Sequence, residues 1–369
     1  MYMIWIPLVY LRTLLGDYFD VSQFFTIFID AIMLTHLLVY MQKRGHKAFY
    51  LSIPLVLSLL LCIFNFGFLV VFNIVLTVVS LKSVSTKKIV LVSFFSSFIV
   101  VFLCVAFLLL GIVPDETVSL SKGFQHVDGH KLGFYNTNVA SMFFFNAILI
   151  TSLFLLEFTK YKIFNYLLLF PCYIVFKLTG GRTTFYAEII YFLCMFIFDS
   201  KFFLRHFRRL YVAIPFLFSF VIFVGLYLYT KYPIIDVVLS GRFYYYNLMF
   251  NDFSLKSLLV GLPINDYSMD CAYLNLFNGG GFVLIYVFFS VYVNGIKKIS
   301  PEAMKKYMPL IICMLASGLA ENTFSTFSPV SIIFYKVLAD QFVLPSKLYV
   351  RAKRYFAPLR RNVICLKSV

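Results

Sequence analysis

Long apolar runs, separated by short polar connections, make up most of this chain. A membrane-spanning helix needs about 20 predominantly apolar residues, and somewhat fewer when it is buried by its neighbours. About twelve segments approach this pattern. The predicted spans are 2–15, 21–41, 48–64, 66–81, 89–113, 135–156, 163–178, 184–198, 210–230, 272–293, 307–320 and 327–343. The pattern predicts an all-α, polytopic integral membrane protein with a single transmembrane domain over residues 1–369.

Composition supports this prediction. Hydrophobic residues make up 62% of the 369 positions and charged residues only 13%, whereas a soluble domain is about half apolar and a quarter charged. No water-soluble fold of this length could bury so much apolar surface, and a disordered chain would be far more polar. Both classes are therefore excluded.

The formal net charge of +16 would suggest nucleic-acid binding in a soluble protein. Here Lys and Arg cluster in alternate connections between the apolar runs, as in Lys43-Arg44-Lys47 and Lys201-Arg205-Arg208-Arg209. Such alternation sets orientation in a bilayer and predicts that these connections, both termini and the basic tail 344–369 are cytoplasmic. We therefore expect no nucleic-acid partner, and we expect the apolar N-terminus to be a retained first span.

Two of the remaining connections are long, and both fall on the predicted outer side. They are 114–134 and 231–271, and the second precedes the tenth span. Residues 241–260 within it have apolar positions near helical spacing, which predicts a helix lying along the membrane surface. The chain has no nucleotide-binding motif, no Cys-x-x-Cys pair and no metal-ligand spacing, so we expect no cofactor and no metal site.

Two Gly-Arg steps stand on the outer side, where basic residues are scarce. Arg182 follows Gly181 in a tight turn before a helix start, where backbone N–H groups and the helix dipole favour an anion. Arg242 follows Gly241 and precedes a Tyr cluster that includes Tyr245, suited to phosphate recognition beside sugar stacking. The alternatives are an Arg182 that snorkels or pairs with Glu188, and an Arg242 that belongs to an interfacial aromatic belt.

Two carboxylates border the same predicted outer face. Asp270 precedes Tyr273 and a Gly-rich helix start, and Glu321 lies at the tip between the last two spans. Partial burial there can raise a carboxyl pKa towards that of a usable base. The alternatives are a helix N-cap for Asp270 and a solvated loop charge for Glu321.

Further polar candidates lie at the start of the sixth span and inside the bilayer. His130, Lys131, Asn136 and Asn138 end one loop and open a helix, as caps or as substrate contacts. Ionisable groups within spans are functional candidates because burying charge is costly. They are Asp30, His36, Glu188 and Asp340, and Lys336 and Asp340 are spaced for a helix-internal ion pair.

These motifs occur in an order that resembles the Wzy-type polysaccharide polymerases of the O-antigen ligase/polymerase superfamily. The resemblance covers roughly residues 129–329 and comprises TGGRT with Arg182, LSGRF with Arg242, the Asn136-Thr137-Asn138 helix start, DCAYL with Asp270 and the late outer Glu321. Two motifs differ from the family pattern. The family often has His-Pro-Asn where this chain has Asn136-Thr137-Asn138, and it often has Asp-Asn where this chain has Asp270-Cys271.

The resemblance implies a metal-independent glycosyltransferase that transfers a growing glycan from undecaprenyl diphosphate to a lipid-linked repeat unit on the outer membrane face. Arg182 and Arg242 would hold diphosphates, and Asp270, Glu321 or His130 would accept a proton. The implied substrate contacts are His130, Lys131, Asn136, Asn138, Gly181, Gly241, Tyr245 and Tyr273.

The implied location is the bacterial cytoplasmic membrane. Expected partners are the lipid-linked oligosaccharide and membrane lipids, and the resemblance also admits a flippase and a chain-length regulator. Two other functions stay open at this point: a ligase of the same superfamily, and a flippase or transporter of the same lipid-linked unit. A transporter is expected to show an internal repeat or charged residues at the membrane midplane.

Overall fold

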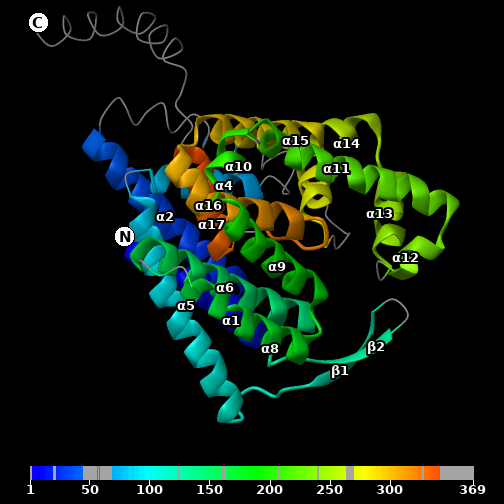
Figure 1. Cartoon of the computed structure of the whole chain (residues 1–369), viewed down its shortest axis with the longest axis horizontal. Helices are drawn as coiled ribbons and strands as arrows, with labels where there is room; N and C mark the ends of the chain where they lie inside the picture. The colour runs from blue at the N-terminus through cyan, green and yellow to red at the C-terminus, as the bar shows by residue number, and fades with distance from the viewer. Residues whose placement is uncertain are drawn as a thin grey trace, which may run out of the picture.

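The structure, a computed structural model, describes residues 2–19, 22–44, 56, 58, 69–82, 84–122, 125–159, 161, 163–206, 208–238, 241–262, 270–325 and 328–340. This part of the chain is mostly helical (Figure 1). The longer helices are α1 (Tyr2–Phe19), α2 (Ser22–Arg44), α4 (Leu69–Ser80), α5 (Thr86–Leu109), α6 (Thr137–Phe158), α8 (Leu169–Thr179), α9 (Arg182–Ile197), α11 (Arg208–Lys231), α13 (Arg242–Asn251), α15 (Ala272–Lys298), α16 (Pro301–Ser317) and α17 (Pro329–Asp340). The short helices are α7 (Ile163–Leu167), α10 (Lys201–His206), α12 (Ile234–Val238) and α14 (Leu255–Val260).

Within the described residues, four helices are long and apolar enough to cross a membrane, namely α5, α6, α11 and α15. They coincide with the predicted spans 89–113, 135–156, 210–230 and 272–293. Every other predicted span also contains a helix, except 48–64, which lies outside the described residues apart from 56 and 58. The helical pattern read from the sequence is therefore confirmed over the described residues.

Burial differs sharply between helices. α16 and α17 are buried along most of their length, and α9 packs along α16 over many residues. By contrast, α11 exposes large apolar side chains such as Phe216, Phe220 and Phe223. In a polar solvent such a face would be costly, whereas in lipid these side chains pack against apolar acyl chains and the helix satisfies its own backbone hydrogen bonds.

The predicted outer loop 114–134 contains a β-hairpin, which corrects the all-α expectation. Strand β1 (Thr117–Lys122) pairs antiparallel with β2 (Gln125–His130), and Thr117 lies opposite His130. In Figure 1 this hairpin extends away from the helices, and β2 contacts α8. Strand β1 alternates only two apolar residues, Val118 and Leu120, with polar ones, and β2 contributes only Val127, so the sequence pattern gives a weak strand signal here.

The predicted long loop 231–271 contains α12, α13 and α14, while residues 263–269 lie outside the described part. This confirms helical structure within 241–260. α14 packs against α15, which bends at Gly281, where φ is 58° and ψ is −153°. The Leu262 backbone N–H donates to the Asn278 carbonyl at 2.9 Å, so the segment after α14 is bonded directly to the bent region of α15.

Candidate functional site

One end of the helix bundle gathers most of the candidate residues. It is the end at which α6, α9 and α15 begin and α16 ends, and we call it the site end. The Cys313 thiol donates to the Ala187 carbonyl at 3.2 Å, which fixes the register of antiparallel α16 and α9. At about 1.5 Å of rise per residue, Arg182 lies about 7–8 Å beyond Ala187, at the same end as the turn that carries Glu321.

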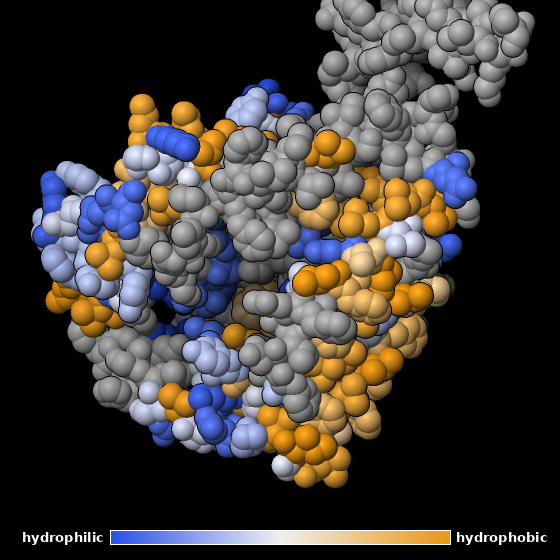
Figure 2. Space-filling view, turned by 180° about the vertical axis from the view of Figure 1, so that it is seen from behind, coloured by the Kyte–Doolittle hydropathy of each residue, from blue (hydrophilic) through white to orange (hydrophobic). Residues whose placement is uncertain are grey.

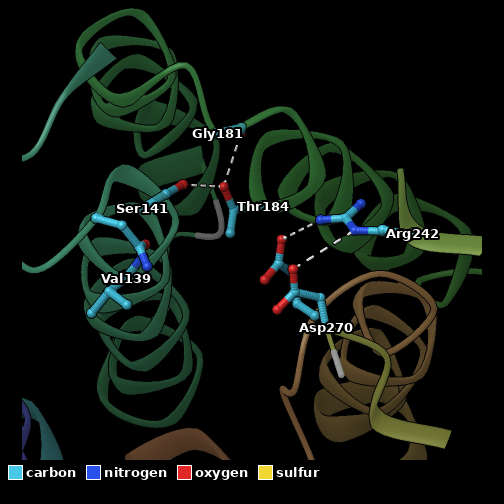
Figure 3. A network of polar contacts seen from close by, with 8 residues as sticks. Val139, Ser141, Gly181, Thr184, Arg242 and Asp270 are labelled. Atoms are coloured by element: carbon cyan, nitrogen blue, oxygen red, sulfur yellow. Dashed lines mark hydrogen bonds and ion pairs between the residues drawn. The ribbon is translucent and has the colours of Figure 1, made fainter. Parts of the chain in front are cut away.

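Arg242 lies between the two predicted carboxylates at this end. Its Nη2 is 3.4 Å from Glu321 Oε1, and its Nε is 3.9 Å from Asp270 Oδ2. Figure 3 shows the guanidinium directed towards the carboxylate of Asp270. The Glu321 and Arg242 side chains are 10% and 22% exposed, so water screens their attraction only partly, whereas the Asp270 side chain is 48% exposed. These three groups carry one positive charge against two carboxylates.

A cap at the N-terminus of helix α13, which the sequence pattern did not predict, positions Arg242. The Asp236 carboxylate accepts hydrogen bonds from the backbone N–H groups of Phe243 at 2.7 Å and Tyr244 at 3.2 Å. These are donors of the first turn of α13, which have no partner within the helix. Gly241 precedes the helix with φ of 82°, a left-handed conformation that favours glycine. Asp236 and Gly241 together fix where α13 begins, and therefore where Arg242 lies.

Backbone and side-chain contacts between α15 and α16 bring Asp270 and Glu321 together. The Ala272 N–H donates to the Gly318 carbonyl at 2.8 Å, and the Tyr273 hydroxyl donates to the Leu315 carbonyl at 3.1 Å. Tyr273 is buried, so the structure places it in the interface between these helices. Cys271, rather than Asp270, is the N-cap residue of α15.

α6 and α9 meet closely at the same end. The Ser141 and Thr184 hydroxyls are hydrogen-bonded, and the Thr184 hydroxyl also donates to the Gly181 carbonyl at 2.9 Å. A Cβ atom at Gly181 would lie 2.0 Å from Ser141 Oγ, so only glycine permits this approach. Figure 3 shows Thr184 on the side of this pair that is nearer to Arg242 and Asp270.

Arg182 is the first residue of α9 and is partly exposed. It makes no ion pair or hydrogen bond with the residues that the structure describes, so the expected alternative of an Arg182–Glu188 pair is not observed; Glu188 is buried in α9. A cation at a helix N-terminus is disfavoured by the helix dipole. Arg182 and the α9 N-terminus therefore present positive potential without a neutralising group among the described residues.

His130 and Lys131 lie at the base of the hairpin and are both paired. His130 Nδ1 is 2.7 Å from Asp115 Oδ2, and Lys131 Nζ is 2.7 Å from Glu116 Oε2. Nothing in the described part of the chain joins either residue to Arg242. Exposed pairs of this kind contribute about 0–1 kcal/mol, so they fasten the hairpin base only weakly.

The other polar candidates have local roles. The Asn136 side chain accepts from the Val139 N–H at 2.8 Å and caps α6, as one of the two sequence interpretations expected. Asn138 is partly exposed in the first turn of α6. Tyr245 is exposed and its ring lies edge-on to that of Tyr244, with centroids 5.4 Å apart.

Two other ionisable groups near Arg242, a thiol and a phenol, are unsuited to act as a base. Burial raises the pKa of the Cys271 thiol to about 12, and burial also raises the pKa of the Tyr246 phenol, with the neighbouring Cys271 adding to the effect. Both groups stay protonated near neutral pH. Asp270 and Glu321 are therefore the better proton acceptors around Arg242.

Polar contacts away from the site end are structural. Lys336 pairs with Asp340, which confirms the helix-internal ion pair, and Asp340 also accepts from the Thr86 hydroxyl at 3.1 Å. The sequence pattern did not indicate Glu157. Its carboxylate accepts hydrogen bonds from Lys306 Nζ at 3.0 Å and from the Tyr307 hydroxyl at 2.6 Å. Within the described ranges, no group of three or more His, Cys, Asp or Glu residues could hold a metal ion.

The surface at this end is hollowed. Figure 2, seen from behind, shows a recess with hydrophilic residues on its wall, on the side where Figure 1 places α12 and α13, and a mainly apolar surface on the opposite side. Such polarity is compatible with a ligand that is polar at one end. No family model, curated protein or solved structure matches the chain, so this site is interpreted from its own residues.

Proposed function

We propose that this chain is a membrane polysaccharide polymerase, which transfers a growing glycan from undecaprenyl diphosphate to a lipid-linked oligosaccharide repeat unit. The observation that carries the proposal is Arg242 between Asp270 and Glu321, at the bundle end where Arg182 opens α9 with no ion-pair partner among the described residues. The site end would face the outside of the bacterial cytoplasmic membrane, with both termini in the cytoplasm and about twelve spans between them.

The proposed reaction joins two sugars without nucleotide or metal. A hydroxyl oxygen of the acceptor repeat unit attacks the anomeric carbon of the donor glycan. The bond between that carbon and the diphosphate oxygen breaks, the hydroxyl proton passes to a carboxylate, and undecaprenyl diphosphate leaves with the bonding electrons. Developing negative charge on the leaving group is the part of this reaction that a fixed cation stabilises.

The charges divide these roles between the two arginines. Arg182 and the α9 N-terminus are suited to the diphosphate, because an anion there would offset both the guanidinium and the helix dipole. Arg242 already faces two carboxylates, so we assign it to orienting them rather than to holding a diphosphate. The two arginines therefore do not both hold a diphosphate, because an anion at Arg242 would also meet the carboxylates of Asp270 and Glu321.

The two carboxylates differ in how far they are exposed to solvent. Asp270 is about half exposed and 3.9 Å from Arg242, whereas Glu321 is nearly enclosed and closer. An acceptor hydroxyl entering from solvent reaches Asp270 more readily. We therefore assign Asp270 as the proton acceptor and Glu321 as the residue that holds Arg242.

A transporter of the same lipid-linked unit is a second candidate, favoured by one specific observation. α15 is interrupted at Gly281, and broken helices are common at the substrate sites of transporters. A superfamily ligase would use the same chemistry with a different acceptor. The three functions differ in which lipid-linked product accumulates when the protein is missing.

A deletion strain tests the proposal. Its lipid-linked and surface glycans are separated on a gel, and the strain is complemented with the intact gene, with Arg182→Ala, or with Lys256→Ala as an exposed control cation from α14. A polymerase is supported if the deletion strain makes single repeat units but no ladder. The intact gene and Lys256→Ala should then restore the ladder, and Arg182→Ala should not. A normal ladder left on the carrier would indicate a ligase, and repeat units trapped at the cytoplasmic face would indicate a flippase; either contradicts the proposal.

A further inference from the structure

A cluster of neutral polar side chains follows the two carboxylates closely along the chain. Asn275, in the first turns of α15, donates through Nδ2 to Asn322 Oδ1 at 3.3 Å and to Ser325 Oγ at 3.2 Å. Ser325 also donates to Asn322 Oδ1 at 3.3 Å. Asn275 follows Asp270 by five residues and Asn322 follows Glu321 directly, so the cluster borders the site that Arg242 organises.

These hydrogen bonds fix which way the Asn275 amide can act. A side-chain amide has two N–H donors and one carbonyl acceptor, and both donors of Asn275 are directed to the loop after α16. Its Oδ1 has no hydrogen-bond partner among the described residues and is not one of the enclosed polar atoms that lack one. Asn275 is partly exposed, so this oxygen is held in place as an acceptor that a ligand can approach.

The acceptor character of this region selects the chemistry of its ligand. Asn275 Oδ1 and the Asp270 and Glu321 carboxylates together outnumber the single cation, Arg242. An anionic phosphate would be repelled by this arrangement, whereas a group rich in O–H donors would be satisfied by it. A sugar ring has this property, and its hydroxyls both donate and accept.

We propose that Asn275 Oδ1 accepts a hydrogen bond from a hydroxyl of the acceptor sugar and helps to determine which sugar is used. The inference rests on the proposed function, since it names the part of the substrate that lies at the carboxylates. Sugar is then recognised at the α15 side of the site, and diphosphate at the α9 side, near Arg182. An unpaired carbonyl beside a bound sugar lacking that hydroxyl would be costly, which is how one amide can discriminate between sugars.

Direct binding to the purified full-length protein in detergent micelles tests this without turnover. The probes are methyl glycosides of glucose, galactose, mannose and N-acetylglucosamine, observed by saturation-transfer NMR, with inorganic pyrophosphate followed separately by phosphorus NMR. Asn275→Leu keeps the side-chain shape but removes the amide. We expect the strongest glycoside signal to fall by about 3- to 10-fold, with pyrophosphate binding unchanged.

Two variants separate sugar recognition from support of the loop. Asn294→Leu makes the same change at the far end of α15, where the Asn294 amide donates to the Ser290 carbonyl, and should leave both signals unchanged. Ser325→Ala removes one loop partner but keeps the Asn275 carbonyl, and should retain most of the glycoside signal. Equal losses in Ser325→Ala and Asn275→Leu would overturn the proposal, because Asn275 would then act only through the loop.

A third variant keeps the test valid if Asn275→Leu does not fold. Asn275→Gln retains the amide and displaces its carbonyl by about one bond length, so it should weaken glycoside binding and change which glycoside binds best. An unchanged glycoside pattern, or no glycoside binding by the intact protein, would overturn the inference and leave the polymerase proposal to the ladder assay. Glycoside binding that depends on Asn275 in a protein whose deletion leaves the ladder intact would instead contradict the polymerase proposal.

Discussion

Arg242 and Glu321 are 79 residues apart in the chain, yet Arg242 Nη2 and Glu321 Oε1 lie 3.4 Å apart at the site end. One residue opens α13 and the other follows α16, so their contact closes a loop through α14 and α15. Asp270, two residues before the start of α15, is the second carboxylate that faces Arg242. A cation held by two carboxylates from separate segments orients both of them, and this is what the proposed proton transfer requires.

The two carboxylates should differ in their effect on activity. Asp270→Asn removes a proton acceptor without changing its size, so we expect repeat-unit transfer to fall by about 100-fold or more. Glu321→Gln keeps a neutral acceptor near Arg242 and should cost about 10-fold or less. Rates are measured with purified protein and lipid-linked repeat units, and thermal midpoints in detergent confirm that both variants fold. A larger loss in Glu321→Gln would reverse the assignment of the base.

Asp236 should matter for stability because it caps α13. Asp236→Ala removes the acceptor for two backbone N–H groups, and loss of such a cap costs about 0.5–2 kcal/mol. A lower thermal midpoint and faster proteolysis within 231–262 are expected. Asp128→Ala, at an exposed position in β2, is the matched control. Equal midpoints for the two variants would show that the Asp236 cap contributes nothing.

The contact between Gly181 and Ser141 gives a test with a designed rescue. Gly181→Ala places a Cβ 2.0 Å from Ser141 Oγ and 2.6 Å from Ser141 Cβ, and overpacking of this kind typically costs about 1–3 kcal/mol. Ser141→Gly removes both obstructing atoms, so the double variant should regain part of the lost stability. The free energies of unfolding of both single variants and the double variant are compared. Strict additivity would mean that the two residues do not collide.

Cys271 should be inert to thiol reagents in the folded protein. Burial raises its pKa from 9.0 to about 12, so the thiol stays protonated at pH 8 and the reactive thiolate is scarce. In a variant with Cys271 as its one cysteine, labelling by N-ethylmaleimide should be slow until the protein is denatured. Ser254→Cys, at an exposed position, provides the reactive control in the same cysteine-free background. Rapid labelling of native Cys271 would contradict its burial.

The raised pKa of Cys271 also fixes the sign of a pH effect. Since the folded thiol holds its proton up to about pH 12 and the unfolded thiol loses it near pH 9, the unfolded state binds fewer protons between these values. Its contribution to stability is therefore complete below pH 9 and is lost as pH rises towards 12. Comparison of Cys271→Ala with the intact protein over this range isolates the effect.

Local patterns predicted the helices and several individual site residues, but not how those residues meet. The apolar runs placed α5, α6, α11 and α15, and the predicted helix within 241–260 contained Arg242. Arg182 was expected in the turn before a helix, whereas it is the first residue of α9. The pairing of Arg242 with Glu321 depends on tertiary contacts across 79 residues, and no local spacing encodes it. The β-hairpin was missed because its two strands are short and together carry few large apolar residues. The Asp236 cap was missed because Asp236 lies seven residues before Phe243 rather than at the N-cap position.

Arg182 and Arg242 should respond differently to removal, and the difference distinguishes a ligand-binding cation from an orienting one. Arg182 has no counter-charge among the described residues and stands where the helix dipole disfavours a cation, so Arg182→Ala should change the free energy of unfolding by less than about 0.5 kcal/mol. Arg242→Ala leaves Glu321 and Asp270 facing each other without their cation, and should cost about 1–3 kcal/mol.

Both Arg variants should nevertheless abolish the glycan ladder, and Arg182→Lys should restore part of it because Lys keeps the charge but loses the planar pair of donors. Ladder formation is scored in the complemented deletion strain, and unfolding is measured on protein purified from the same cells. A stability loss in Arg182→Ala as large as that in Arg242→Ala would show that Arg182 serves the fold. A full ladder in a stable Arg182→Ala protein would show that the α9 N-terminus does not hold the diphosphate.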